Sequence, residues 1–226
     1  MFISFEGIDG CGKSTQARLL ADALRVEGRD VVLTREPGGS PGAEEIRRLL
    51  VEGAGERWSG ETEALLFTAA RRDHLERTIR PALARGATVI TDRFADSTRV
   101  YQGAARGELR DLVDRLHDLA IGIEPDLTLV IDVDPGFAFQ RARSRELAAK
   151  AAAVSAAPNA YDAAKIMRET LALAADENRF ESLGLGFQQE LATGFRALAA
   201  EYPDRVRLID GSGSADAVAA RVRAAL

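Results

Sequence analysis

The sequence predicts an α/β fold in which helices cover both faces of a five-stranded parallel sheet. Two observations support this prediction. Short, β-prone apolar segments alternate with longer segments whose apolar residues recur at helical spacing, as Ala17, Leu20, Ala21 and Leu24 do. In addition, a glycine-rich segment joins the first expected strand directly to the first expected helix. The strands are expected over residues 2–5, 31–34, 87–91, 127–133 and 206–209.

The composition fits one globular domain over residues 1–226. Of these 226 residues, 46% are hydrophobic and 29% are charged, so the chain is long enough to bury a large core. The net charge of −5 argues against a nucleic-acid partner. Cys11 is the only cysteine, which excludes an intrachain disulfide and a cysteine-cluster metal site. No apolar run approaches the length of a membrane span, and we expect a soluble, cytoplasmic protein without a membrane partner.

The glycine-rich segment, residues 7–15, is the most informative stretch. Its spacing, Gly then four residues then Gly-Lys-Ser, is typical of a phosphate-binding loop. The helix that follows begins with backbone N–H groups that have no intrahelical partner, and phosphate oxygens can accept from them. Lys13 would add a positive charge, and the Ser14 hydroxyl would bind the Mg²⁺ ion of a nucleoside triphosphate. The alternative is a glycine turn that opens an ordinary helix. The residues expected to bind ATP here are Gly7, Ile8, Asp9, Gly10, Cys11, Gly12, Lys13, Ser14 and Thr15.

Polar residues also follow the second and third expected strands. The loop 35–40 follows the second strand, and Asp92 and Arg93 follow the third. The carboxyl ends of parallel strands share one edge of the sheet, where ligands bind. An aspartate in this position holds Mg²⁺ in phosphate-loop proteins, usually through water, and Arg93 beside it can grip a phosphate with two hydrogen bonds. The alternatives are a solvated turn at 35–40 and an Asp–Arg pair that only closes a loop.

A long helical segment is expected over residues 61–85, with a bend near Pro81. Phe67 and Arg71 are four residues apart and therefore lie on one side of this helix. A nucleobase could stack on Phe67 while one of its carbonyl groups accepts from Arg71. The alternative is core packing of Phe67 beside a surface arginine. The core face of this helix is expected to contain Leu65, Leu66 and Ala69, and that of the helix expected over 108–120 to contain Leu109, Leu112, Val113, Leu116 and Leu119.

Three arginines fall in the helix expected after the fourth strand. Arg141 and Arg145 share one side of a continuous helix, whereas Arg143 points nearly opposite. All three therefore cannot face one phosphate, and a solvated helix face is the alternative. The segment 148–175 that follows is rich in alanine and poor in large apolar residues.

These features favour transfer of the γ-phosphoryl group of ATP to a nucleotide. The base-reading Asn-Lys-x-Asp pattern of GTPases does not occur in the chain. Arginines beyond the donor phosphates, together with the pair of Phe67 and Arg71, suit a second nucleotide. Two alternatives stay open: a kinase for another pyrimidine nucleotide or nucleoside, and a noncatalytic ATP-binding switch.

Five blocks of the sequence, residues 5–15, 35–40, 65–74, 91–103 and 125–133, resemble in order those of the thymidylate kinase family. The resemblance covers nearly the whole chain except about 147–177, and it implies a three-layer fold of the P-loop NTPase type with a helical lid over about 137–181. It also implies the conversion of ATP and dTMP to ADP and dTDP with Mg²⁺, usually in a homodimer. The segment 147–177 is then an insertion: a lid extension, a contact surface or a surface helix without a role.

The resemblance further implies roles for individual residues. Phe67 would stack on thymine, Arg71 would bond its carbonyl edge, and Tyr101 would crowd the 2′ position of the sugar. The phosphate loop has no basic residue among its variable positions, so the transition-state charge should come from the lid. The family also favours a cis peptide bond before Pro37. By this assignment the catalytic residues are Lys13, Arg93, Arg143 and Arg179, with Arg141 and Arg145 as further lid candidates. Arg141 also binds ATP together with the phosphate loop, and Ser14 and Asp92 bind Mg²⁺. The residues that bind dTMP are Asp9, Arg35, Pro37, Phe67, Arg71, Arg93, Thr98, Tyr101 and Gln102.

Overall fold

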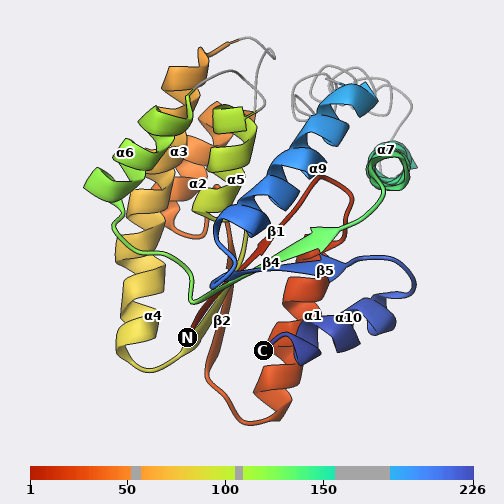
Figure 1. Ribbon diagram of the computed structural model, residues 1–226, viewed down its shortest axis with the longest axis horizontal. Coiled ribbons are helices and arrows are strands. Elements are labelled where there is room, and N and C mark those ends of the chain that lie inside the picture. Colours follow the sequence, from red (N-terminus) through yellow and green to blue (C-terminus); the bar gives the residue numbers. More distant parts are fainter. Residues whose placement is uncertain (52–56, 105–108, 156–183) are drawn as a thin grey trace.

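The computed structural model describes residues 1–51, 57–104, 109–155 and 184–226 (Figure 1). Within these ranges, five parallel strands form one sheet in the order β2-β3-β1-β4-β5. The predicted α/β fold is therefore confirmed, and each strand lies within a residue or two of its expected position. The strands are β1 (Phe2–Glu6), β2 (Val31–Arg35), β3 (Thr88–Asp92), β4 (Leu127–Asp132) and β5 (Val206–Asp210).

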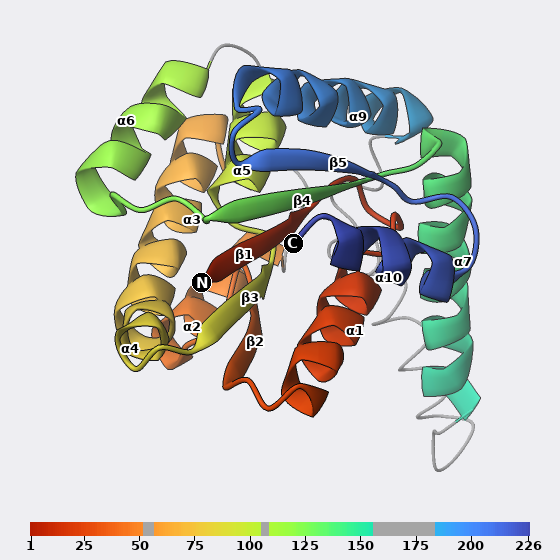
Figure 2. The same ribbon diagram turned by 60° about the horizontal axis from the view of Figure 1, so that its bottom comes forward.

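Helices cover both faces of the sheet. The helices α1 and α10 lie on one face, whereas α3, α5, α6 and α9 lie on the other (Figures 1 and 2). The helices are α1 (Lys13–Val26), α2 (Pro41–Val51), α3 (Gly60–His74), α4 (Arg80–Ala84), α5 (Ala95–Thr98), α6 (Arg110–Ala120), α7 (Pro135–Ser155), α9 (Gly184–Glu201) and α10 (Ala215–Ala224), with π-helical segments η1 (Leu75–Ile79) and η2 (Arg99–Ala104). Among the described helices, none combines the length and the hydrophobicity that crossing a membrane requires.

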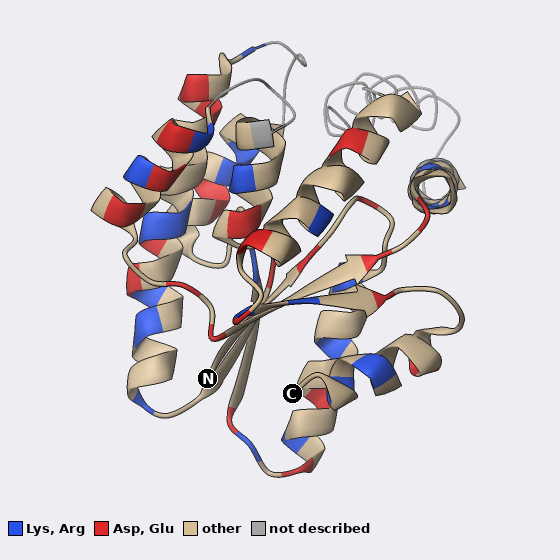
Figure 3. Ribbon diagram, viewed as in Figure 1, with Lys and Arg blue, Asp and Glu red and all other residues tan. Residues whose placement is uncertain are grey.

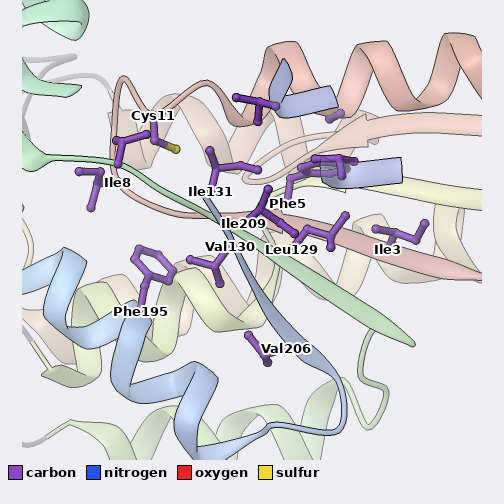
Figure 4. Packing of buried hydrophobic residues seen from close by; sticks show 14 of the residues in the cluster. Ile3, Phe5, Ile8, Cys11, Leu129, Val130, Ile131, Phe195, Val206 and Ile209 are labelled. Carbon is purple, nitrogen blue, oxygen red and sulfur yellow. The ribbon is translucent and has the colours of Figure 1, made fainter. Parts of the chain in front are cut away.

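The central strand β1 fixes the position of the loop that follows it. All five of its residues are buried, and it pairs with β3 on one side and β4 on the other. Figure 4 shows Phe5 of β1 close to Leu129 of β4, with Ile8 and Cys11 of the loop also in the core. A loop that leaves a fully buried strand has little freedom to move, so the phosphate-binding segment starts from a rigid base.

Charged residues in the strands lie mostly at the carboxyl ends (Figure 3). The register aligns Arg35 of β2 and Phe5 of β1 with Asp92 of β3, and Asp132 of β4 with Asp210 of β5. The buried strand residues that precede this edge are apolar or carry a hydroxyl group, whereas the edge itself collects carboxylates and guanidinium groups. The edge is where ligands bind in parallel α/β sheets.

The structure corrects the expected core faces of two helices. Leu65 of α3 is 53% exposed, and Leu119 of α6 is 85% exposed. Ala69 is also exposed, whereas Arg71 and His74 of α3 are buried. The reason is that the buried side of α3 carries polar groups, which bond to the ends of β2 and β3, so an apolar stripe does not mark it. The helix expected over 61–85 is continued after α3 by η1 and α4.

Candidate active site

A cleft of about 900 Å³ opens at the carboxyl edge of the sheet. It brings together the phosphate loop, the loop after β2, helix α3, the end of β3, the α5–η2 segment and α7. Lys13 and Arg93 face this same cleft, as phosphoryl transfer from ATP to a second nucleotide requires. The predicted site residues that line it are Asp9, Gly10, Gly12, Lys13, Ser14, Thr15, Arg35, Pro37, Phe67, Arg71, Asp92, Arg93, Thr98, Tyr101, Gln102, Arg141 and Arg145; Gly7, Ile8, Cys11 and Arg143 do not line it, and Arg179 lies outside the described residues.

The phosphate loop has the backbone conformation that its glycines permit. Gly10 has φ +82°, and a side chain there would meet the Ala138 carbonyl oxygen of α7, because an added Cβ would lie 2.1 Å from it. Gly12 precedes α1 in a left-handed conformation with φ +104° and offers no side-chain cap. The Nζ of Lys13 folds back and donates to the carbonyl oxygen of Ile8 at 2.8 Å. The first N–H groups of α1 and one ammonium group therefore converge at the mouth of the loop.

Asp9, Arg93 and Tyr101 form a hydrogen-bonded triangle beside the loop. The Arg93 Nη2 donates to Asp9 Oδ1 at 2.5 Å and to the Tyr101 hydroxyl at 3.0 Å, and that hydroxyl donates to Asp9 Oδ2 at 2.9 Å. Burial opposes ionisation of Asp9, but the charges of Arg93 and Lys13 outweigh it and lower the pKa of Asp9 to about 2. Asp9 is therefore a carboxylate at neutral pH, and it fixes the guanidinium plane of Arg93.

Arg93 also has an unusual backbone. Its φ of +74° lies in the left-handed region, which costs a residue other than glycine about 1–3 kcal/mol. The strained turn is held by hydrogen bonds on both sides: Arg93 N donates to Phe5 O at 2.9 Å, and Thr91 Oγ1 donates to Arg93 O at 2.8 Å. The conformation turns the Arg93 side chain toward the phosphate loop.

Ser14 and Asp92 lie together in the cleft, where Ser14 Oγ donates to Asp92 Oδ2 at 2.5 Å. A hydroxyl and a carboxylate are hard oxygen donors of the kind that Mg²⁺ prefers. Magnesium commonly takes only one or two protein ligands and completes its shell with water and substrate phosphates. The two side chains therefore fit the ion that a nucleoside triphosphate carries.

Arg71 is buried and held in one orientation. Its Nε donates to Glu36 Oε2 at 2.7 Å, and its Nη2 donates to Thr98 Oγ1 at 2.9 Å. His74 bonds the other oxygen of Glu36 at 2.9 Å, so this carboxylate joins two residues of α3. The alternative of a surface arginine is therefore wrong, because Arg71 is only 3% exposed. Phe67 is half-buried and lines the cleft.

Two other predicted residues, Arg35 and Gln102, differ in their exposure and in their hydrogen-bond partners. Arg35 is exposed and pairs with Glu44 at 3.2 Å across the loop after β2. Gln102 is buried, its Nε2 donates to Glu63 Oε2 at 3.4 Å, and its Oε1 has no hydrogen-bond partner within the described residues. The peptide bond before Pro37 is cis, as the resemblance led us to expect.

Comparisons with known proteins agree with this geometry. Residues 5–180 match the family model for thymidylate kinase. The chain belongs to the thymidylate kinase family. It is 59% identical to the thymidylate kinase of Jannaschia sp. (strain CCS1), over 97% of this chain and 92% of that protein. It is 60% identical to that of Dinoroseobacter shibae, over 99% of this chain and 95% of that protein. The crystal structure of thymidylate kinase from Ehrlichia chaffeensis matches with a TM-score of 0.70 and 33% identity, over 100% of this chain and 97% of that one.

In this member of the thymidylate kinase family, α7 presents Arg141 and Arg145 to the cleft. Arg141 lies 5.5 Å from the ring centre of Phe137, which also lines the cleft. Arg143 is exposed and does not line the cleft, because it lies two positions from both of the other arginines on a continuous helix. Its predicted role in turnover stays a prediction.

Several residues in the cleft or directly behind it were not predicted from the sequence. Glu36 holds Arg71, and Arg47 lines the cleft and donates to Pro37 O at 2.7 Å. Glu6 is completely buried; its Oε1 accepts from Phe94 N at 2.7 Å, and its Oε2 lies within hydrogen-bond distance of Ser97 Oγ, at 2.5 Å. One signal could have found Glu6: a carboxylate that ends an otherwise apolar, buried strand needs a partner.

Proposed function

We propose that this chain transfers the γ-phosphoryl group of ATP to the phosphate of dTMP, giving ADP and dTDP. One observation carries the proposal. Asp9 Oδ1 lies 2.5 Å from Arg93 Nη2 and 3.9 Å from Lys13 Nζ, so a single carboxylate stands between a donor-side and an acceptor-side cation. Two phosphates bound by these cations would meet across Asp9. Membership of the thymidylate kinase family supports dTMP as the acceptor.

On the donor side, we assign the phosphates of ATP to the phosphate loop. The N–H groups at the start of α1 would donate to the β- and γ-phosphate oxygens, and Lys13 would neutralise part of their charge. Ser14 and Asp92 would hold Mg²⁺, which neutralises phosphate charge when it is bound. Arg141, on α7, is assigned to the ATP side of the cleft.

On the acceptor side, the base would stack on Phe67, and Arg71 would donate to a carbonyl at its 4-position. Thr98 and Gln102 would lie near the base, and Tyr101 near the sugar. Arg93 would hold the acceptor phosphate, together with Arg35 released from Glu44. No general base is required, because a phosphate monoester is already an anionic nucleophile, so positioning and charge neutralisation carry the rate.

The lid and the domain organisation complete the proposal. We assign one domain over residues 1–226 with a lid at about 137–181, and we assign the transition-state charge to a lid arginine. Arg141, Arg143, Arg145 and Arg179 are the candidates, and the position of Arg141 and Arg145 in the cleft supports these two. The insertion at 147–177 lies mostly outside the described residues.

A homodimer and a cytoplasmic location also belong to the proposal. Leu49 of α2, Leu65 of α3 and Leu119 of α6 are 41%, 53% and 85% exposed. Helix α3 packs on both α2 and α6, so these side chains belong to adjoining helices. Covering exposed leucines favours association of two copies. Light scattering should give twice the chain mass, and a Leu65→Glu variant that stays fully dimeric would count against this surface.

The function is tested by coupled ADP release with dTMP, dUMP, dCMP and AMP. The proposal expects the highest kcat/KM with dTMP, and low values with dCMP because its 4-amino group cannot accept from Arg71. Preference for another pyrimidine nucleotide would favour the nearest alternative. Tight ATP binding without phosphoryl transfer to any acceptor would favour a noncatalytic switch.

A further inference from the structure

A buried carboxyl group lies directly behind the acceptor-side arginine. Glu6 is 0% exposed and is not among the described residues that line the cleft. It reaches the cleft through Ser97, which does line it and which is 8% exposed. Ser97 Oγ lies 2.5 Å from Glu6 Oε2 and 2.8 Å from the Nη1 of Arg93. A continuous chain of hydrogen bonds therefore joins Glu6 to the guanidinium group assigned to the acceptor phosphate.

The protonation of Glu6 decides where the Ser97 hydrogen points. A hydroxyl group has one hydrogen to donate and two lone pairs that accept. Arg93 donates to one lone pair of Ser97. If Glu6 is ionised, Ser97 must donate its hydrogen inward to Glu6. If Glu6 is protonated on Oε2, it donates to the second lone pair, and the Ser97 hydrogen is free to point into the cleft.

The surroundings of Glu6 favour the protonated form at neutral pH. Burial and the negative charge of Asp96 raise the pKa of Glu6 to about 8, although Ser97, Arg93 and the N–H of Phe94 oppose the shift. Asp96 and Arg93, both in the segment after β3, are the charged groups with the largest effect on Glu6. Asp96 is itself held ionised, since Arg205 and Arg99 lower its pKa against the effect of burial.

We propose that Glu6 is a positioning residue for the acceptor phosphate: its protonated carboxyl group turns the Ser97 hydroxyl into the cleft, where it donates beside Arg93. This role deepens the proposed function and rests on it. Ionisation of Glu6 would withdraw that donor and would add a negative charge behind Arg93. Both changes weaken binding of an anionic acceptor, whereas the ATP phosphates bind on the other side of Asp9.

The test compares the KM values for dTMP and for ATP between pH 7 and pH 9. We expect the KM for dTMP to rise roughly threefold to tenfold, which corresponds to the loss of one hydrogen bond, while the KM for ATP changes less. The phosphate group of the acceptor is largely a dianion throughout this range, because the second pKa of a phosphate monoester is about 6. Burial also raises the pKa of the Cys11 thiol and of the Tyr101 hydroxyl, so neither adds a charge in this window.

Three variants separate the outcomes. Glu6→Gln keeps an acceptor for Phe94 N and has an amide donor for Ser97 that does not ionise, so its KM for dTMP should not rise between pH 7 and pH 9. Ser97→Ala should raise this KM at pH 7 and remove most of the rise. Glu27→Gln, a surface control whose carboxylate pairs with Arg223, should keep the full rise.

Each result bears on the role of Glu6. A full rise in Glu6→Gln, or in Ser97→Ala if Glu6→Gln does not fold, would overturn it, as would a flat profile in the unchanged protein. Absence of dTMP phosphorylation at every pH would instead overturn the proposed function.

Discussion

Replacing Glu6 with glutamine should change how the stability of the fold depends on pH. The carboxyl group has a pKa of about 8 in the native state against an ordinary value of 4.5. Between these values the native state keeps a proton that the unfolded state has released, so raising the pH removes stability. Each pH unit in this window costs about 1.4 kcal/mol. Between pH 6 and pH 8 the loss is about 2 kcal/mol, because the group is half ionised at the upper limit.

Urea unfolding at pH 6 and pH 8, followed by circular dichroism at one protein concentration, measures this loss. Glu6→Gln cannot ionise at this position and should not lose this stability. The unfolding free energy of the variant minus that of the unchanged protein should therefore be about 2 kcal/mol larger at pH 8 than at pH 6. The exposed-carboxylate variant Glu27→Gln should show no such gain. A difference between Glu6→Gln and the unchanged protein that is the same at both pH values would refute the reasoning, since it would mean that Glu6 is already ionised at pH 6.

Three further predictions concern the cleft. Arg71→Ala should raise the KM for dTMP by roughly tenfold or more, because it removes a hydrogen bond from a charged group, and the KM for ATP should change little. Equal changes in both KM values would contradict the assignment of Arg71 to the base. Gly10→Ala should lower the melting temperature and abolish ATP binding measured by calorimetry, because its added Cβ would lie 2.1 Å from a carbonyl oxygen of α7; a variant that binds ATP normally would show that the loop can relax. Arg143, Arg145 and Arg179 should each be replaced by alanine. The variant that removes the arginine at the transferred phosphoryl group should show a kcat lower by a factor on the order of 10³, with little change in ATP affinity. An unchanged kcat in all three variants would show that none of these three lid arginines takes part in the mechanism.

The strands and the phosphate loop could be predicted because their signals are local. The segment 2–5 is apolar and β-prone, and the loop beside it needs left-handed residues at fixed positions, which glycine supplies. Parallel connections then bring the loop, Asp92 and Arg93 to one edge of the sheet, whatever the details of packing. The site could therefore be located before the side chains were placed.

The polar face of α3 could not be predicted in the same way. Periodicity identifies the apolar side of a helix, but α3 buries Arg71 and His74 and leaves Leu65 in solvent. The partner that makes this burial tolerable is Glu36, which is 38 residues away from His74 and belongs to another element. The sequence around each residue gives no sign of this pair, because the two residues meet only once the chain has folded.

Glu36 in the cleft and Glu6 behind it are both buried carboxyl groups, and what they cost in stability indicates what they do. A buried ion pair such as that of Arg71 with Glu36 adds little net stability, because desolvation offsets the attraction between the charges. A buried, protonated Glu6 costs stability as soon as the pH rises. Glu36 instead fixes the orientation of Arg71, and Glu6 that of the Ser97 hydroxyl, before any ligand binds. Donors that are already aligned need no reorganisation when the phosphates arrive, and this is the condition under which fixed charges accelerate phosphoryl transfer. The buried carboxyl groups of Glu6 and Glu36 therefore serve the geometry of the cleft at the expense of the stability of the fold.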